Sequence, residues 1–244
     1  MTRYPLDRNI VPEWMAERLE RFHNDRNAIV IGIPRSGTRI AIDLARRLSL
    51  PSEVLFIDKL EQPTAVAYSE DGFMLHDHAD PGWHEVQRQR KLVRELERRA
   101  AARMENRMAD LHETRMRQSI KKKSVIMVDD AMVTGLTMLA AVHVACRENA
   151  REIIVAAPVA HREALDKVAW FSDEIVCLCR VSQFDSRWDG ISPIPDLNSL
   201  ELTRMWNQLC WRRQGRRNLK KKPFGEYDTR TLERLVSHRL AEAA

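Results

Sequence analysis

The sequence predicts an α/β protein with a doubly wound, mostly parallel sheet, and two features predict this class. Short apolar runs that suit buried strands alternate with stretches whose apolar residues recur at helical spacing, and right-handed crossovers make such strands parallel. Two strand–helix junctions also carry small residues, hydroxyls and charges, and open parallel sheets bind ligands at such junctions. The runs expected to form strands are 28–33, 54–57, 125–128, 151–159 and 174–179.

The composition fits a globular chain of one or two domains. The chain has 244 residues, of which 44% are hydrophobic. No apolar run reaches membrane-spanning length and the first residues lack an apolar signal core, so we expect a cytoplasmic protein with no membrane segment. Four scattered cysteines fit a reducing compartment. The net charge of +5 favours anionic ligands, but it is too small to establish nucleic-acid binding.

The first part of the chain is expected to supply a helix, two strands and an inserted hairpin. Residues 1–27 contain an amphipathic helix at 11–22, and a core is expected over 28–182. The stretch 64–76 alternates between apolar and polar residues around Glu70-Asp71-Gly72, which predicts the hairpin.

A long charged helix is predicted over 84–118, which contains no glycine or proline. If continuous, this helical arm would be roughly 50 Å long at 1.5 Å per residue. Its apolar stripe is narrow, which indicates packing against the core or against a partner subunit. The stripe consists of Leu92, Leu96, Ala100, Met104, Met108 and Leu111.

Three histidines follow the hairpin, with carboxylates between them. Their close spacing could bind a transition metal, and a polar turn closed by Pro81-Gly82 is the alternative. The residues are His76, Asp77, His78, Asp80 and His84.

The most informative stretch is SVIMVDDAMVTGLTM, residues 124–138. A buried strand leads directly into Asp129 and Asp130, and Thr134-Gly135-Leu136-Thr137 precedes an apolar helical run. A helix N-terminus attracts an anion, and carboxylates accept hydrogen bonds from a sugar diol. One loop could thus hold a phosphate and a ribose together. The alternative is a buried strand that ends in a capped helix, with Asp130 as an incidental turn residue.

The order of residue types in this loop resembles the signature of the type I phosphoribosyltransferases. That signature is an apolar run, two acids, a small residue, two apolar residues and Thr-Gly-x-Thr. The resemblance covers about residues 28–181. Within the family the chain looks closest to an uncharacterised branch of predicted phosphoribosyltransferases, whose pyrophosphate-binding loop reads Pro-Arg-Gly-Gly. Here Pro34-Arg35-Ser36-Gly37 stands at that point, with Ser36 in place of the first glycine.

The resemblance implies a pentosyltransferase that uses phosphoribosyl pyrophosphate with Mg²⁺ as donor. Asp129 and Asp130 would be the catalytic acids, holding the ribose hydroxyls and the metal. Arg35, Ser36 and Gly37 would bind the pyrophosphate. The loop expected to bind the rest of the donor, chiefly its 5-phosphate, consists of Ala131, Val133, Thr134, Gly135, Leu136 and Thr137.

Further contacts are implied for the same site. The branch carries a lysine after the second strand, so Lys59 is a candidate pyrophosphate contact, with a solvated lysine as the alternative. In the family the segment matching 64–76 is a mobile flap. A small hood, here 183–211, supplies an edge for the acceptor, and Trp188 would stack on the acceptor ring or fill the lid.

The C-terminal segment 212–244 is expected to be a basic linker and a helix. Its run 212–222 holds seven Lys or Arg and no acid. We expect a solvated linker there; contact with a nucleic-acid backbone is the less favoured alternative. A homodimer or larger homo-oligomer is expected.

The residue at position 133, a valine, limits which acceptors are expected. The 6-oxopurine salvage enzymes carry an aspartate at this position, which acts as acid or base, and a valine cannot transfer a proton. Hypoxanthine–guanine salvage is therefore disfavoured, and we expect an unidentified, nitrogenous acceptor. The alternative function is a catalytically inactive regulatory protein that senses a nucleotide or phosphoribosyl pyrophosphate and binds nucleic acid.

Overall fold

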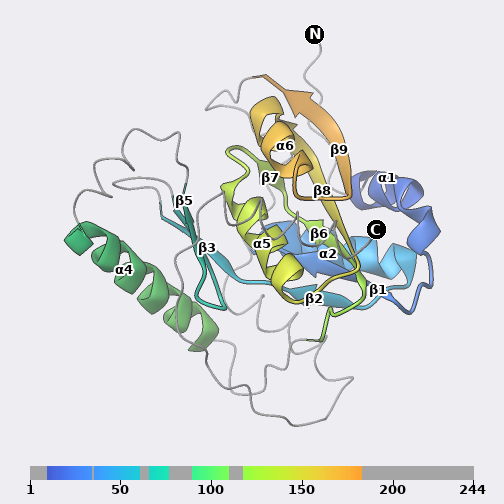
Figure 1. Ribbon diagram of the computed structural model, residues 1–244. Coiled ribbons are helices and arrows are strands. Elements are labelled where there is room, and N and C mark those ends of the chain that lie inside the picture. The colour runs from blue at the N-terminus through green and yellow to red at the C-terminus, as the bar shows by residue number, and fades with distance from the viewer. Residues whose placement is uncertain (1–9, 35, 61–65, 77–89, 110–117, 183–244) are drawn as a thin grey trace, which may run out of the picture.

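A computed structural model describes residues 10–34, 36–60, 66–76, 90–109 and 118–182. Its centre is a six-stranded, fully parallel sheet (Figure 1), which confirms the expected fold class. The order is β2-β1-β6-β8, with β9 on the outer side of β8 and the short β7 beside β8. The strands are β1 (Ala28–Gly32), β2 (Ser52–Val54), β6 (Ser124–Val128), β7 (Ala131–Met132), β8 (Glu152–His161) and β9 (Glu174–Val181).

Helices cover both faces of this sheet. One face packs against α1 (Ile10–Arg18), the short 3-10 helix η1 (Glu20–Phe22) and α2 (Ser36–Leu48). The other face packs against α5 (Leu136–Arg147) and α6 (Arg162–Ala169). The sheet is therefore doubly wound, as expected.

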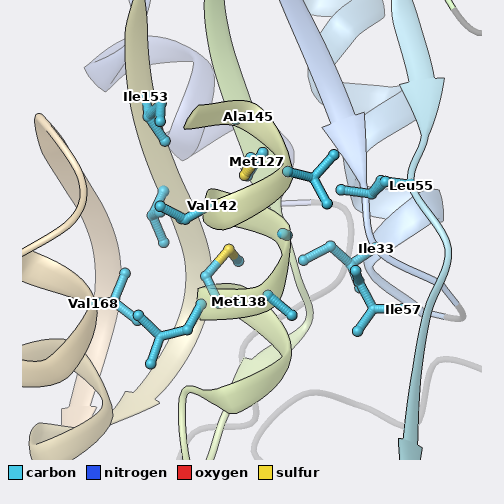
Figure 2. Close-up of a cluster of buried hydrophobic side chains, with 14 of the residues drawn as sticks. Ile33, Leu55, Ile57, Met127, Met138, Val142, Ala145, Ile153 and Val168 are labelled. Atoms are coloured by element: carbon cyan, nitrogen blue, oxygen red, sulfur yellow. The ribbon is translucent and has the colours of Figure 1, made fainter. Parts of the chain in front are cut away.

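Burial on both faces explains why the strands read as continuous apolar runs. Every residue of β1 and of β6 is buried. Successive side chains alternate between the two covers: Ile29 and Ile31 belong to the cluster beneath α5 and α6, whereas Val30 belongs to the cluster beneath α1 and α2. Figure 2 shows the first cluster, where Met138 and Val142 of α5 lie over the sheet.

A second, three-stranded antiparallel sheet lies beside the first. It consists of β3 (Ile57–Leu60), β4 (Val66–Ser69) and β5 (Met74–His76). The predicted hairpin is confirmed, because β4 pairs with β5 around the turn at Glu70-Asp71-Gly72.

The single strand expected at 54–57 is wrong. The chain leaves the central sheet after Val54, and Ile57 begins β3 of the second sheet. Phe56 marks the bend: its N–H donates to Glu70 Oε2 at 2.9 Å, and its carbonyl oxygen accepts from the N–H of Glu70 at 3.0 Å. An apolar run shows burial but not the sheet to which each residue belongs.

The second sheet is covered on both faces. Ala67 and Leu75 pack in the cluster beneath α5, while Val66, Tyr68 and Met74 pack against α4 (Arg90–Ala109). The predicted hairpin thus packs between α5 on one face and α4 on the other.

The helical arm packs against the core. α4 has 20 residues, and residues 118–120 have no regular secondary structure, so the helix does not extend to 118. Of the predicted stripe, Leu96, Ala100 and Met104 are buried against the second sheet. Among the described residues, no helix is both long and apolar enough to cross a membrane.

Several expectations concern residues outside the described ranges. These include Arg35, His78, His84, Leu111, the hood 183–211 with Trp188, and the basic C-terminal segment 212–244. His76 is described, and it is buried at the end of β5. The metal hypothesis for the three histidines and the domain boundaries therefore stay predictions.

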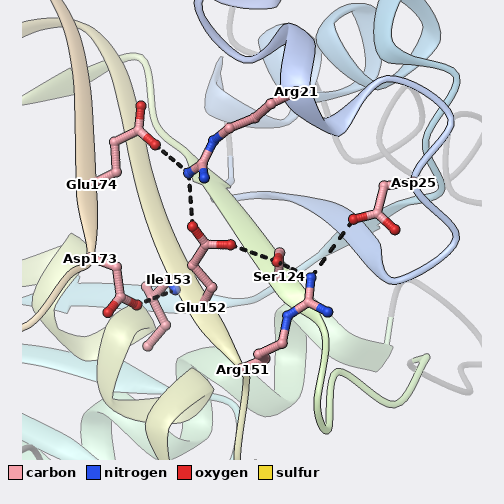
Figure 3. Close-up of polar contacts among 8 residues, drawn as sticks. All are labelled: Arg21, Asp25, Ser124, Arg151, Glu152, Ile153, Asp173 and Glu174. Atoms are coloured by element: carbon pink, nitrogen blue, oxygen red, sulfur yellow. Dashed lines mark hydrogen bonds and ion pairs between the residues drawn. The ribbon is translucent and has the colours of Figure 1, made fainter. Parts of the chain in front are cut away.

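Charged side chains connect the amino-terminal edge of the central sheet (Figure 3). Glu152 of β8 accepts hydrogen bonds from Arg21 of η1 and from Ser124 Oγ of β6, both at 2.8 Å. Arg21 also pairs with Glu174 of β9, and Arg151 donates to Ser124 Oγ at 2.8 Å. Partly exposed pairs of this kind add little stability each. They lie at the edge opposite to the one where parallel sheets bind ligands.

The contact between α5 and the hairpin includes a fully buried histidine. The ring of His143 stacks on Phe73, with centroids 3.5 Å apart and planes 14° apart. Burial lowers the pKa of His143 to about 4; nearby Asp71 opposes this lowering and Arg147 adds to it. The imidazole is therefore neutral in the folded chain at neutral pH, whereas in the unfolded chain it takes up a proton below about pH 6.5.

We expect His143 to make the chain less stable at acidic pH. Because the unfolded state binds more protons between about pH 6.5 and pH 4, the free energy of unfolding should fall across this window as pH falls. The contribution of this one residue should be roughly 2 kcal/mol between pH 7 and pH 5. Urea unfolding at both pH values would measure it for the wild-type chain and for His143→Leu, in which this part of the pH dependence should disappear. The exposed His23→Gln serves as control, and an unchanged pH dependence in His143→Leu would contradict the prediction.

Candidate active site

The two acids lie where the strand pairing of the central sheet is interrupted. β6 pairs with β8 up to Val128↔Ala156, and the pairing resumes in the same register at Ala131↔Val159. Asp129 and Asp130 occupy the gap. Pro158 lies opposite them on β8, and a proline has no N–H to continue the ladder. The N–H of Asp129 still donates to the carbonyl oxygen of Ala156 at 3.1 Å, and the chain leaves the ladder after this bond, at the carboxyl-terminal edge.

Asp129 is buried and surrounded by charge. Its side chain accepts a hydrogen bond from the N–H of Asp130 at 2.8 Å, and the residue is 9% exposed. Burial raises the pKa of Asp129 well above its usual value, the negative charge of Asp130 raises it further, and the positive charge of Lys59 lowers it. Asp130 is half-buried. The arrangement favours a cation or hydrogen-bond donors next to the pair.

The start of α2 contacts the end of β6 at Gly37. A methyl group on Gly37 would lie 2.7 Å from the carbonyl oxygen of Val128 and 2.8 Å from Cα of Asp129, so only glycine fits. The N–H of Ile33 donates to the same Val128 oxygen at 2.9 Å. Ser36 is buried in the first turn of α2. The first turn of α2, where the helix carries partial positive charge, therefore lies against the acids.

The turn after β7 has the form of an anion-binding loop. Gly135 has φ +78°, a left-handed conformation that favours glycine, and it directly precedes α5. Thr134 Oγ1 accepts a hydrogen bond from the N–H of Leu136 at 3.3 Å. The remaining N–H groups in the first turn of α5 have no carbonyl partner within the helix, and the half-buried Thr137 adds a hydroxyl beside them.

The other predicted loop residues differ in what they could offer. Ala131 is half-buried and directly follows the acids. The side chain of Leu136 is 4% exposed and belongs to the hydrophobic core, so it can contribute only through its backbone. Val133 is 50% exposed, although its neighbour Met132 is buried. The exposed side chain of Val133 thus adds apolar surface to the loop that joins the acids to the anion-binding turn.

Lys59 of the second sheet acts on Asp129 through its charge. It is half-buried on β3 and close enough for its charge to act on Asp129. The sequence alone did not separate this arrangement from a solvated lysine. It also missed the partner of the neighbouring Asp58, which is Arg103 on α4 at 3.0 Å (Nε to Oδ2). A carboxylate directly after the apolar run 54–57 was the signal that such a partner exists.

The acid pair fits a magnesium ion that a ligand completes. Among the described residues no group of three or more His, Cys, Asp and Glu side chains could hold a metal alone. Mg²⁺ is commonly bound by one or two carboxylates together with phosphate oxygens and water. Two neighbouring carboxylates with a raised pKa at Asp129 match that requirement, because a bound cation offsets their mutual repulsion.

The family model and the curated relatives that match this chain carry the same description. The model of the phosphoribosyl transferase domain matches residues 6–185. Proteins of two Mycobacterium tuberculosis strains, each named "Putative phosphoribosyl transferase", are 28% identical over 184 residues, which is 73% of this chain and 41% of theirs. The match thus spans about two fifths of these curated relatives.

A solved structure shares the fold. The crystal structure of the protein TT1426 from Thermus thermophilus superposes with a TM-score of 0.69 at 23% identity. The similarity covers 85% of this chain and 99% of that one.

The substitution Gly37→Ala tests how closely the two junctions approach. On an open helix the change would add up to about 1 kcal/mol of stability. Here the new methyl group meets backbone atoms on β6, so the free energy of unfolding should fall by roughly 1–3 kcal/mol. Urea unfolding measures it, with the adjacent Ser36→Ala as control, because Ser36 already carries a Cβ. A more stable Gly37→Ala chain would show that the junctions are not in contact.

Proposed function

We propose that this chain, which belongs to the phosphoribosyl transferase domain family, transfers the phosphoribosyl group of phosphoribosyl pyrophosphate to an acceptor and releases pyrophosphate. One observation carries the proposal: the paired acids, the glycine turn before α5 and the first turn of α2 come together at the carboxyl-terminal edge of the sheet. The donor has three parts to be bound, namely a ribose diol, a 5-phosphate and a pyrophosphate, and each of these elements could bind one of them.

The ribose and the 5-phosphate would lie along one loop. The carboxylates of Asp129 and Asp130 would accept hydrogen bonds from the ribose hydroxyls. The phosphate would sit at the N-terminus of α5, held by N–H groups and by the hydroxyls of Thr134 and Thr137. The left-handed Gly135 supports this placement, because it turns the backbone directly into the helix.

The pyrophosphate would lie between α2 and β3. The first turn of α2, with Ser36 and Gly37, offers N–H groups, and Lys59 offers a positive charge from the opposite side. Arg35, outside the described residues, is proposed as a further contact. Positive charge on both sides would stabilise the leaving group as its bond to the sugar breaks.

Magnesium is part of this proposal. Asp129 and Asp130 would hold it together with donor oxygens, and when bound it neutralises charge on the pyrophosphate. The side chains contribute by positioning: they fix the sugar between the acids and the anion-binding turn while an acceptor displaces pyrophosphate at the anomeric carbon. A negative acid pair beside the sugar also favours a cationic sugar-like transition state.

The acceptor is proposed to be a nitrogenous compound that is nucleophilic without help from an acid or base at Val133. The exposed valine side chain can contact an acceptor but cannot move its proton. Trp188, outside the described residues, is proposed to stack on it. A homodimer or larger assembly in the cytoplasm completes the proposal; light scattering of the purified chain would measure its size.

Neutralising the acids tests the proposal. We expect Asp129→Asn and Asp130→Asn to reduce pyrophosphate release from Mg-phosphoribosyl pyrophosphate by roughly 100-fold or more, because the amide keeps the shape and loses the charge. A coupled pyrophosphate assay with a panel of nitrogenous acceptors would measure this. The matched control is Asp43→Asn on α2, whose carboxylate pairs with Arg39 and Arg46 at 3.2 Å each.

The outcomes separate the enzyme from the sensing alternative. Full release in both acid variants would contradict the proposed site. Donor binding that disappears in the variants, without release by the wild-type chain for any acceptor, would favour a protein that senses phosphoribosyl pyrophosphate.

Val133 gives a second prediction, about acceptor choice. Guanine and hypoxanthine should give little or no turnover in the wild-type chain, since proton transfer from this position is absent. Val133→Asp should raise the rate with these two bases relative to the rest of the panel, while Val133→Asn, which is similar in size and cannot act as a base, should not. Robust guanine turnover by the wild-type chain would overturn the prediction.

A further inference from the structure

We propose that the outer edge of the central sheet, formed by β9, pairs with the same strand of a second copy of this chain. Among the described residues β9 pairs only with β8, so its other side offers backbone N–H and carbonyl groups for a further strand. The inference rests on the proposed homodimer, for which it assigns the contact surface, and does not depend on the proposed reaction.

The sequence of β9 lacks the features that commonly protect an edge strand. β9 has eight residues and contains no proline or glycine, and its two charged residues, Glu174 and Arg180, lie near its ends. Short strands, prolines, bulges and inward-pointing charges are the usual means of keeping another strand away. A long edge with an apolar middle, such as this one, therefore invites pairing with another strand.

Apolar side chains on both faces of β9 are only partly covered within the chain. Ile175 and Cys177 pack at the margin of the cluster beneath α5 and α6, whereas Leu178 packs at the margin of the cluster beneath α1 and α2. All three are half-buried, in contrast to every residue of β6 in the middle of the same sheet. A strand added beside β9 would extend both clusters and remove further apolar surface from water.

The charges near the two ends of β9 favour a second copy as the partner. In an antiparallel pair centred on Cys177, residues at equal distances from the centre lie opposite each other. Glu174 then lies opposite Arg180 of the partner subunit, and the same contact recurs at the other end of the pair. Opposite charges at directly opposed positions stabilise a strand pair. The strand is thus complementary to itself about a two-fold axis.

This register joins the two charges without breaking a contact inside the chain. Arg180 is the only exposed residue of β9, so its guanidinium is accessible to a partner. Glu174 pairs with Arg21 of η1, and its two carboxylate oxygens can accept from a second arginine as well. A slip by two residues, which keeps each side chain on its face, would place Arg180 opposite Val176 or Ser172. The charges therefore select the first register.

Each copy would keep its own site in such a pair. Because the paired strands run antiparallel, the carboxyl-terminal edges of the two sheets face opposite ends of the joined sheet. The acids lie at that edge in each copy, where the pairing of β6 with β8 is interrupted. The contact between the copies therefore needs no donor.

Charge reversal in the full chain tests the pairing. We expect the wild-type chain to be dimeric by light scattering. Arg180→Glu and Glu174→Arg should each weaken the dimer about tenfold or more, since like charges would then be opposed at two places. An equal mixture of the two variants restores opposite charges, and its dimer should have an affinity within about threefold of the wild type. The matched control is Lys121→Glu, an exposed residue before β6 with the same change of net charge as Arg180→Glu, and it should stay dimeric.

Three outcomes would overturn the inference. These are a monomeric wild-type chain, an Arg180→Glu chain as dimeric as the wild type, and a mixture of two folded variants that associates no better than its components. Arg180→Glu leaves the pair between Glu174 and Arg21 intact, so it decides alone if circular dichroism shows that Glu174→Arg does not fold.

Hydrogen exchange locates the contact on the chain. Amides in the peptide 174–181 should exchange about tenfold faster in Arg180→Glu than in the wild-type dimer, because those pointing away from β8 lose their partner strand, while the amides of β1 should not change. The mixture of variants should recover the protection. Equal exchange of this peptide in the wild type and in Arg180→Glu would overturn the inference and assign the cover of this edge to another segment of the chain or to a different protein.

Discussion

The interruption between β6 and β8 is the constraint on which the site depends. Both strands are buried in a parallel sheet, where every backbone N–H and carbonyl normally has a ladder partner. Pro158 removes one donor directly opposite Asp129 and Asp130, and the pairing resumes at Ala131 without a change of register. The sheet therefore stays intact on both sides of a two-residue gap, and that gap carries the acids. A loop of the same composition at an unpaired strand end would be held far less firmly.

Close backbone contacts then bring the other groups to this gap. Gly37 lets α2 touch the end of β6, and Gly135 lets the anion-binding turn lie against Ala164 of α6, where an added methyl group would come within 3.2 Å of the carbonyl oxygen. The second sheet supplies Lys59, whose positive charge lowers the pKa of Asp129. Charge explains why this convergence is useful, because Asp129 is buried beside a like charge and is best stabilised by ligands that carry positive charge or hydrogen-bond donors.

The sequence was most informative where one local pattern carried the whole signal. A buried strand, two acids and a glycine turn before a helix are consecutive, so the site around Asp129 and Gly135 could be predicted without tertiary information. The bend at Phe56 could not, because it depends on hydrogen bonds to Glu70, which a continuous apolar run does not reveal. The sequence also left open whether the stripe with Leu96 and Met104 packs against the core or against a partner subunit, because its contacts with the second sheet are long-range. Asp58 was passed over because its partner, Arg103, lies 45 positions away in the sequence.

A crystal structure of the chain with phosphoribosyl pyrophosphate and Mg²⁺ tests the central claim most directly. The account predicts that the two ribose hydroxyls lie within hydrogen-bonding distance of the carboxylates of Asp129 and Asp130, with the 5-phosphate at the first turn of α5. It would be contradicted by a donor bound elsewhere on the chain, or by one bound at this edge with its ribose away from both acids.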